Sequence, residues 1–227
     1  SQDDQQTPTT AHTSTPVLTD VSRIVSAGPS LTFNQMTGGP NDIALHPTTH
    51  LPAIVYYDRN INVSATTAIG ALKYTWQDAS GSWHIEVVDA NFGTAVCGTA
   101  GSNCVGAQNT AAPASVSLIR LAFKSDGSPA VAYVYGGTTA TSKQVRFAER
   151  NASGTWSPSV AFSSASTVAT TVLDFSIKGL TLNFDSSNRP HITFHSYGAT
   201  LTTDSKLKYV YRTSGGQWSN PVDIMSI

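Results

Sequence analysis

The chain has 227 residues, of which 40% are hydrophobic and only 12% are charged, and its formal net charge is −1. A net charge so close to zero excludes the basic footprint of a nucleic-acid-binding protein, and no apolar run reaches the roughly 18 to 20 residues of a transmembrane segment. Ser, Thr, Gly and Asn replace charged residues, as is typical of exported β proteins with many turns. We therefore expect a secreted, extracellular or cell-surface protein, with the periplasm as an alternative.

Residues 1–20 form a polar arm rich in Thr, Ser, Gln and Pro, with almost nothing to bury. This composition is typical of a disordered linker, so an ordered arm would need support from its own domain or from a neighbouring chain. The arm has neither the basic n-region nor the apolar h-region of a signal peptide, and we expect any such peptide to have been removed. Residues 21–40 contain strand-like runs, which we expect to pack on a neighbouring sheet or to complete it.

Three twelve-residue stretches align without a gap: LKYTWQDASGSW at 72–83, VRFAERNASGTW at 145–156 and LKYVYRTSGGQW at 207–218. Each follows a strand-like run, a polar turn, a proline and a second strand-like run. A proline suits the first position of a strand, where no N–H group is needed for the ladder. The runs are rich in Val, Ile, Tyr, Phe and Thr, and none has a helical period. The aligned prolines are Pro52, Pro129 and Pro190.

Each unit therefore predicts four short antiparallel strands, and the units occupy 41–90, 115–163 and 175–226 of a domain that spans 41–227. Repeated four-stranded units are the signature of propeller blades, because a single sheet must stack on neighbours to cover its faces. We predict an all-β fold, a β-propeller-type array of about three four-stranded antiparallel blades. Propellers close with roughly four to eight blades, so this array is incomplete as a single ring.

The pattern LNFDSSNRPHITFH followed by LKYVYRTSGGQW resembles a repeat common in secreted bacterial β-propeller proteins of the sialidase-like group. The resemblance covers about two thirds of the chain. The turns DASGSW and NASGTW also resemble the Asp-box of sialidases, although only the first has its Asp near the expected place. The resemblance implies a propeller fold, and it implies little about activity because this repeat occurs in proteins of many kinds.

An insertion at 91–114 contains the chain's two cysteines, Cys97 and Cys104. They lie close together among small residues, so a disulfide could close a short loop. The alternatives are two free thiols or half of a metal site, but there is no second Cys pair and no His at metal-motif spacing. We expect the disulfide, and with it an oxidising compartment.

A tryptophan opens the predicted last strand of each unit. One interpretation is that these rings pack at the boundary between adjacent sheets, and the other is that they form a row of sugar-binding platforms. In the second interpretation, nearby tyrosines would add aromatic surface and nearby arginines would donate hydrogen bonds. The candidate ligand-binding residues are Trp83, Trp156, Trp218, Tyr74, Tyr209, Arg146 and Arg212.

Metal and catalytic signals are weak. His191 and His195 in HITFH point to the same face of a strand and are the only metal candidates, with structural packing as the alternative interpretation. Glycoside hydrolysis needs a pair of carboxylates, and neither of the two glutamates, Glu86 and Glu149, is marked out by its context. No phosphate, dinucleotide or haem motif occurs, so we expect no cofactor.

Three functions remain open from the sequence. The first is a non-catalytic binding or scaffold protein of a cell-surface or extracellular assembly, with a second copy or other subunits closing the exposed blade faces. The second is a lectin-like propeller that binds glycans. The third is a sialidase-like glycosidase. Catalysis is the least expected of these, since no complete catalytic set can be assembled from the sequence.

Overall fold

The computed structural model describes residues 37–64, 67–90, 94–96, 115–136, 142–165, 177–197 and 205–226. Within these ranges the chain forms strands joined by tight turns, and no helix occurs. A search of the same ranges for a helix long and apolar enough to cross a membrane finds none. The polar arm, the strand-like runs before Thr37 and the expected Cys97–Cys104 disulfide lie outside the described residues.

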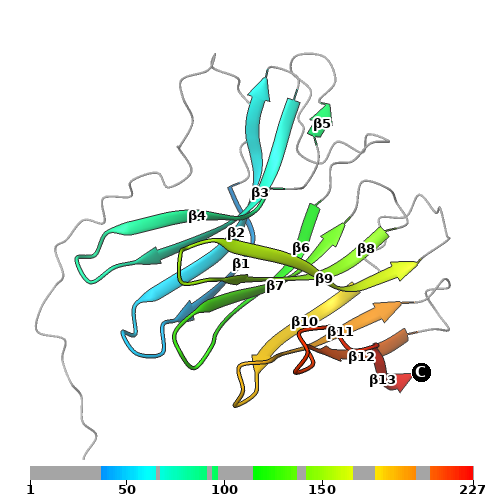
Figure 1. Cartoon of the computed structure of the whole chain (residues 1–227). Coiled ribbons are helices and arrows are strands. Elements are labelled where there is room, and N and C mark those ends of the chain that lie inside the picture. The colour runs from blue at the N-terminus through cyan, green and yellow to red at the C-terminus, as the bar shows by residue number, and fades with distance from the viewer. Residues whose placement is uncertain are drawn as a thin grey trace, which may run out of the picture.

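The strands form three antiparallel sheets, and within each sheet consecutive strands pair in chain order (Figure 1). The first sheet consists of β1 (Thr37–Leu45), β2 (Pro52–Ser64), β3 (Thr67–Gln77) and β4 (Trp83–Asp89), with β5 (Thr94–Val96) added to β3. The second consists of β6 (Ser115–Phe123), β7 (Pro129–Gly136), β8 (Ser142–Arg150) and β9 (Trp156–Ala165). The third consists of β10 (Ile177–Phe184), β11 (Pro190–Tyr197), β12 (Ser205–Tyr211) and β13 (Val222–Ser226). The prediction of three four-stranded antiparallel sheets is confirmed, and the described residues form no closed ring.

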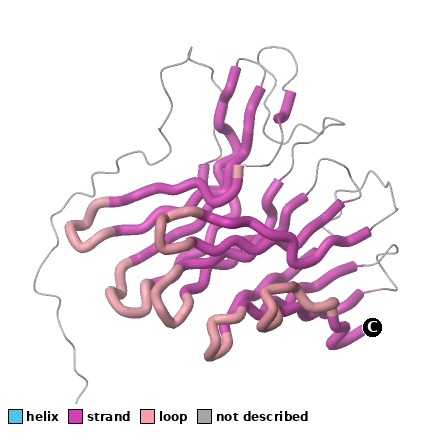
Figure 2. The backbone as a smooth tube through the Cα atoms, in the orientation of Figure 1, coloured by secondary structure: helices cyan, strands magenta, loops and turns pink. Residues whose placement is uncertain are grey.

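The turn before each aligned proline places a residue in the left-handed region. Gly127 has φ 83° and Asn188 has φ 57°, and each donates its N–H group to the residue three positions earlier. This is the geometry of a type I turn followed by a bulge, and it favours Gly or Asn. In the first sheet the turn is one residue longer, and His50 has φ 57° there. Figure 2 shows that the tight turns gather at one end of the sheets.

The three Gly–Trp turns share a glycine with positive φ, and the first two also share a side-chain bond. The Asp78 carboxylate accepts hydrogen bonds from the N–H groups of Ser80 at 2.9 Å and Ser82 at 3.0 Å. The Asn151 side chain accepts the equivalent bonds in the second sheet. Hydrogen bonds from the Ser80 hydroxyl and from His84 hold the pKa of the Asp78 carboxyl well below its usual range. The Asp-box-like residue therefore shapes the turn.

The third sheet departs from the predicted pattern in its last strand. β4 and β9 begin at their tryptophans, whereas β13 begins at Val222, four positions after Trp218. Trp218 forms an isolated bridge with Arg212. Pro221 follows shortly afterwards, and it has no N–H group to donate to a ladder. The proline explains why regular pairing starts only at the next residue.

The second sheet is buried on both faces. Along β7, successive side chains point alternately to the first sheet and to the third. Val131, Tyr133 and Tyr135 belong to the core shared with the first sheet. The core shared with the third sheet takes the smaller side chains of the same strand, which are Ala130, Ala132 and Val134.

The same relation holds along the array. In β2, Ala53 and Val55 stand one and three positions after the proline and pack on the second sheet, as Ala130 of β7 packs on the third. In β11, Ile192 stands two positions after the proline and packs back on the second sheet, as Val131 of β7 packs on the first. The three sheets thus follow one another head to tail. Their first strands, β1, β6 and β10, contact one another in that order.

This burial predicts that truncating two apolar side chains to alanine will have very different effects on the free energy of unfolding. Phe194 is 1% exposed in the core between the second and third sheets, and Val160 is 45% exposed. Phe194→Ala should lower the free energy of unfolding by about 3–5 kcal/mol, whereas Val160→Ala should change it by about 0.5 kcal/mol or less. Urea unfolding followed by circular dichroism would measure both, and equal losses would contradict the described packing.

Candidate functional site

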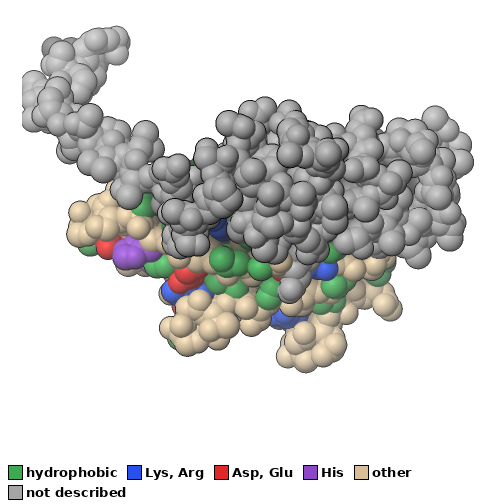
Figure 3. Space-filling model, turned by 90° about the horizontal axis from the view of Figure 1, so that it is seen from above, with side chains coloured by type: hydrophobic (Ala, Val, Ile, Leu, Met, Phe, Trp, Pro, Cys, Tyr) green, Lys and Arg blue, Asp and Glu red, His purple; other side chains and the backbone are tan. Residues whose placement is uncertain are grey.

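Several polar side chains with defined partners lie where the sheets meet. We name the contact between the first and second sheets the first seam, and the contact between the second and third sheets the second seam. On the surface that Figure 3 leaves visible, hydrophobic side chains lie among charged ones. Both seams contain apolar core residues together with arginine–glutamate pairs.

A glutamate joins two residues of the neighbouring sheet at the first seam. Arg150 donates two hydrogen bonds to Glu86, with Nε to Oε2 at 2.8 Å and Nη2 to Oε1 at 2.7 Å. Trp156 donates its indole N–H group to the same carboxylate at 2.8 Å. Because the arginine forms two parallel hydrogen bonds, the pair fixes the orientation of the two side chains in addition to providing charge attraction. The last strands of the two sheets are thereby held in one register.

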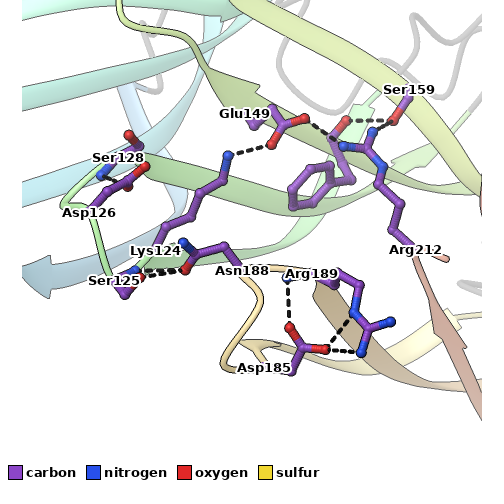
Figure 4. Close-up of polar contacts among 11 residues, drawn as sticks. Lys124, Ser125, Asp126, Ser128, Glu149, Ser159, Asp185, Asn188, Arg189 and Arg212 are labelled. Carbon is purple, nitrogen blue, oxygen red and sulfur yellow. Dashed lines mark hydrogen bonds and ion pairs between the residues drawn. The ribbon is translucent and has the colours of Figure 1, made fainter. Parts of the chain in front are cut away.

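The second seam repeats this arrangement with different residues (Figure 4). Arg212 donates to Glu149, which also pairs with Lys124 at 2.6 Å. The Trp218 indole nitrogen lies 3.4 Å from the Ser159 hydroxyl, and an Arg212 nitrogen lies 3.5 Å from it. Arg150 and Arg212 align in the repeat, as do Glu86 and Ser159. An arginine and a tryptophan therefore contact the same position of the preceding sheet at both seams.

The tight turns also contact one another from sheet to sheet. The Asn188 side-chain oxygen accepts from the N–H group of Ser125 at 2.8 Å and from its hydroxyl at 3.0 Å (Figure 4). At the first seam, a Cβ atom on Gly127 would lie 2.6 Å from His46 Nε2. The glycine therefore supplies both the left-handed backbone and the space for a ring from the first sheet.

A buried polar cluster lies deeper in the first seam. Tyr133 donates its hydroxyl to Asp89, and Arg146 Nη1 contacts the same carboxylate oxygen at 3.0 Å. The Asp89 side chain is fully buried, and the guanidinium carbon lies 3.5 Å from the centre of the Tyr135 ring. Burial, followed by the charge of Asp89, raises the pKa of the Tyr133 hydroxyl above its usual range. The Asp89 carboxylate is thus hydrogen-bonded to Tyr133 and ion-paired with Arg146.

Both described glutamates have lowered pKa values. Burial opposes ionisation of Glu86, but hydrogen bonds from Arg150 and Trp156 outweigh it and lower the pKa of the carboxyl group. Burial likewise opposes ionisation of Glu149, and hydrogen bonds from Lys124 and Arg212 lower its pKa. A general acid in glycoside hydrolysis needs the opposite shift.

The first seam opens at the turn end into a pocket of about 330 Å³. Its walls come from the β1–β2 turn, the end of β3, the β6–β7 turn and Arg150 at the end of β8. Tyr74 and Trp76 stand side by side on β3, with ring centres 5.4 Å apart and planes 20° from parallel. Burial raises the pKa of the Tyr74 hydroxyl above its usual range. The pocket combines aromatic surface with a few polar groups, as is typical of small-molecule sites.

The sequence-predicted site residues divide among four places. Tyr74 and Trp156 meet at the first seam, with ring centres 5.2 Å apart, and Arg146 lies in the buried cluster there. Arg212 and Trp218 meet at the second seam, with the guanidinium carbon 5.4 Å from the ring centre. The outward face of the first sheet carries Trp83, and that of the third sheet carries Tyr209. The structure therefore brings these residues together in pairs and not in one site.

The two candidate metal ligands share the outward face of β11, since they stand four positions apart on one strand. His191 donates to or accepts from the Tyr209 hydroxyl at 2.6 Å and stacks against the rings of Tyr209 and Tyr211. Its Nε2 atom is buried and lies 3.4 Å from Asp185, without a good hydrogen bond. In the part of the chain that the structure describes, no three His, Cys, Asp or Glu side chains gather as metal ligands.

The two ends of the array carry exposed apolar side chains. On the first sheet, Ile43 and Leu45 are 61% and 59% exposed on the face turned away from the second sheet. On the third sheet, Val222 and Met225 are 48% and 60% exposed on β13. We name these the head face and the tail face. Trp83, the equivalent of the two seam tryptophans, is 40% exposed on the head face.

Sequence reasoning missed four residues that shape the first seam: Glu86, Arg150, Trp76 and His46. One signal was available for Arg150, because Arg212 occupies the same place in the next repeat. The other three are not repeated, since their equivalents are Ser159, Glu149 and Lys124. In the sequence alone, nothing distinguishes these three residues from ordinary strand and turn residues.

Comparison with known proteins adds no identity. No protein-family model matches the chain, and no curated protein matches it in sequence.

The seam glutamates predict a loss of stability in acid. Their folded-state pKa values lie below the ordinary 4.5, so their contribution is present above that pH and is lost as the pH falls through the lowered values. A Glu86→Gln/Glu149→Gln variant should therefore be less stable than the parent at pH 7, and the difference should shrink at about pH 3.5. Urea unfolding at both pH values would measure this. A difference that is constant between them would show that the two carboxylates do not titrate as described.

The buried cluster predicts a strong effect at Asp89. Asp89→Ala leaves the Arg146 charge and the Tyr133 hydroxyl without their partner, and should cost about 3–5 kcal/mol of unfolding free energy. Adding Arg146→Met should recover part of this loss, because the uncompensated charge is then removed. Thermal and urea unfolding of Asp89→Ala, Arg146→Met and the double variant would test the coupling, and purely additive losses would contradict it.

Proposed function

We propose that this protein is a non-catalytic, exported binding or scaffold module whose three sheets are propeller-type blades, completed by further blades at the head and tail faces. The observation that carries the proposal is the head-to-tail burial, which leaves one face of each kind without a neighbouring sheet among the described residues. The head face is exposed in part, since Ile43 and Leu45 are exposed there while Tyr56, Lys73 and Thr75 are buried. The low charge and the Ser- and Thr-rich composition support export.

The arrangement of the sheets supports a propeller-type array. Contact between neighbouring sheets is extensive at their first strands, as between β1 and β6, and sparse at their last strands, as between β9 and β12. Sheets that touch along one edge and diverge at the other fan around an axis. The two end faces, which no described sheet covers, carry exposed apolar side chains. Such surfaces promote association with further sheets.

A second copy of the chain is the partner that fits these faces. The side chains of the head face are equivalent to those with which the second sheet packs on the first and the third packs on the second. The side chains of the tail face are equivalent to those on the opposite sides of these two contacts. Two copies could therefore join head to tail twice, in a heterologous arrangement that closes. Trp83 would then lie against a preceding sheet, as Trp156 does at the first seam.

The end faces lack the polar pairing of the internal seams. Gln77 stands where Arg150 and Arg212 stand in the other repeats, and Pro221 stands where Glu86 and Ser159 stand. A joint between the tail and head faces would therefore form without the arginine–carboxylate pair. Since that pair contributes both energy and register, the joint should be weaker than the internal seams and reversible with concentration.

The charges at the seams argue against a glycosidase. Arg146, Arg150 and Arg212 are each paired with a carboxylate, so they do not form a free cluster for an anionic substrate. Both glutamates are held ionised by cationic neighbours. These pairings favour a structural role for the groups that catalysis would need.

Light scattering after size-exclusion chromatography tests the assembly. The parent chain should shift from one copy to two as its concentration rises, and Ile43→Lys on the head face or Met225→Lys on the tail face should each keep it monomeric. Val160→Lys, at an exposed position of the second sheet, is the matched control and should leave the shift unchanged. A parent chain that stays monomeric at all concentrations would overturn the proposal.

Mixing the two monomeric variants tests the head-to-tail geometry. One intact joint can form between the unaltered tail face of Ile43→Lys and the unaltered head face of Met225→Lys. The mixture should therefore form mixed dimers that neither variant forms alone. Failure of the mixture to associate, with the parent dimeric, would indicate a joint that uses the same face of both copies.

A further inference from the structure

The pocket at the first seam contains a polar group without a partner. Tyr74 is 4% exposed and lines this pocket. Its hydroxyl makes no hydrogen bond to any other residue within the described ranges. The hydroxyl oxygen is not among the fully buried atoms that lack a partner, so it is open to the pocket, where a ligand hydroxyl can bond to it.

Aromatic surface lies next to this hydroxyl. Trp76 is half-buried, lines the pocket, and makes no indole hydrogen bond with the described part of the chain. The guanidinium carbon of Arg150 lies 5.4 Å from the centre of its ring. The Trp76 ring stacks on Tyr74 and on His84, with ring centres 5.4 and 5.0 Å away. The part of the ring that lines the pocket can contact the apolar face of a bound ring, while the Tyr74 hydroxyl can pair with polar groups at that ring's edge.

The arginine of the pocket is already paired with a carboxylate, and the pocket carries a further carboxylate of its own. Arg150 is paired with Glu86, and Asp78 lines the pocket. An anionic ligand would have to compete with Glu86 for the arginine. The pocket therefore favours a neutral ligand that has an apolar face and several hydroxyl groups, and a pyranose ring is such a ligand.

We infer that the first seam is a single binding site for a neutral saccharide unit, which contacts Trp76 and bonds to the Tyr74 hydroxyl. The pocket volume of about 330 Å³ lies at the small end of the roughly 300–1,000 Å³ range of ligand sites. One sugar ring fits this size better than an extended chain. The inference does not depend on assembly through the end faces.

The second seam does not repeat this site. Phe147, which has no hydroxyl, replaces Tyr74, and Glu149 replaces Trp76. The charge of Glu149 is taken up by Lys124 and Arg212 (Figure 4). The chain therefore carries one saccharide site of this kind within its described seams, in contrast to a lectin with an equivalent site at every blade.

The four tryptophans of the chain provide separate indole N–H signals in a ¹⁵N-labelled sample. Titration with methyl β-D-glucopyranoside, methyl β-D-galactopyranoside, methyl α-D-mannopyranoside and N-acetylglucosamine should shift the Trp76 signal with at least one sugar and leave the Trp83 signal unchanged. Lactose and sialyllactose form a second pair, and the sialylated sugar should bind no more tightly. A complete lack of shifts, or shifts confined to Trp83, would overturn the inference.

Matched variants locate the site. Tyr74→Phe should weaken binding of the sugar that shifts Trp76 by roughly five- to tenfold, as expected for one hydrogen bond, and Trp76→Ala should abolish it. Tyr209→Phe and Trp83→Ala make the same chemical changes outside the pocket and should leave affinity unchanged. Urea unfolding of each variant would confirm that it is folded.

The same titration with a triproline peptide distinguishes sugar from peptide, because proline rings also stack on tryptophan. Shifts of Trp76 by the peptide and by none of the sugars would overturn the saccharide assignment. Shifts by a sugar that persist undiminished in Tyr74→Phe would also overturn it, because the unpartnered hydroxyl would then have no role in binding.

Discussion

The two-sided burial of the second sheet is the constraint on which the rest of the structure depends. β7 places Val131, Tyr133 and Tyr135 against one neighbour and smaller side chains against the other. A sheet with two apolar faces cannot be stable in isolation, because one face would always meet water. The first and third sheets cover these faces, and each then has an outward face of its own. The second sheet is therefore buried on both faces, while exposed apolar side chains remain on the outward faces of the first and third sheets.

Polar pairs determine how the sheets meet, whereas apolar packing supplies most of the energy. Apolar contacts between two sheets have no preferred direction, so they define the relative position of the sheets only weakly. An arginine that forms two bonds to Glu86 tolerates much less displacement, because both bonds depend on direction. The bond from Trp156 to Glu86 fixes a further point of the first seam, near the last strands. The bond from Ser125 to Asn188 fixes a point of the second seam, at the turns.

The local pattern of the sequence predicts much of the fold. Pro52, Pro129 and Pro190 open their strands as expected, and the Gly–Trp turns lie where the repeat places them. The side-chain pairs across the seams could not be predicted in this way. Glu86 and Arg150 are 64 positions apart, and their contact depends on how two finished sheets are offset. Pattern reasoning also cannot identify the pocket, because its walls come from turns of two different repeats.

The places where the repeats differ are as informative as the places where they agree. The seam arginine occurs twice and is Gln77 in the first repeat, and the acceptor position becomes Pro221 in the third. Both exceptions fall on the outward faces, where no internal neighbour requires the pair. Trp76 and Tyr74 lie on an internal face, but their equivalents Glu149 and Phe147 belong to a seam closed by Lys124 and Arg212. Divergence at the ends accompanies the lack of a described partner sheet, whereas divergence at the first seam accompanies a pocket at its turn end.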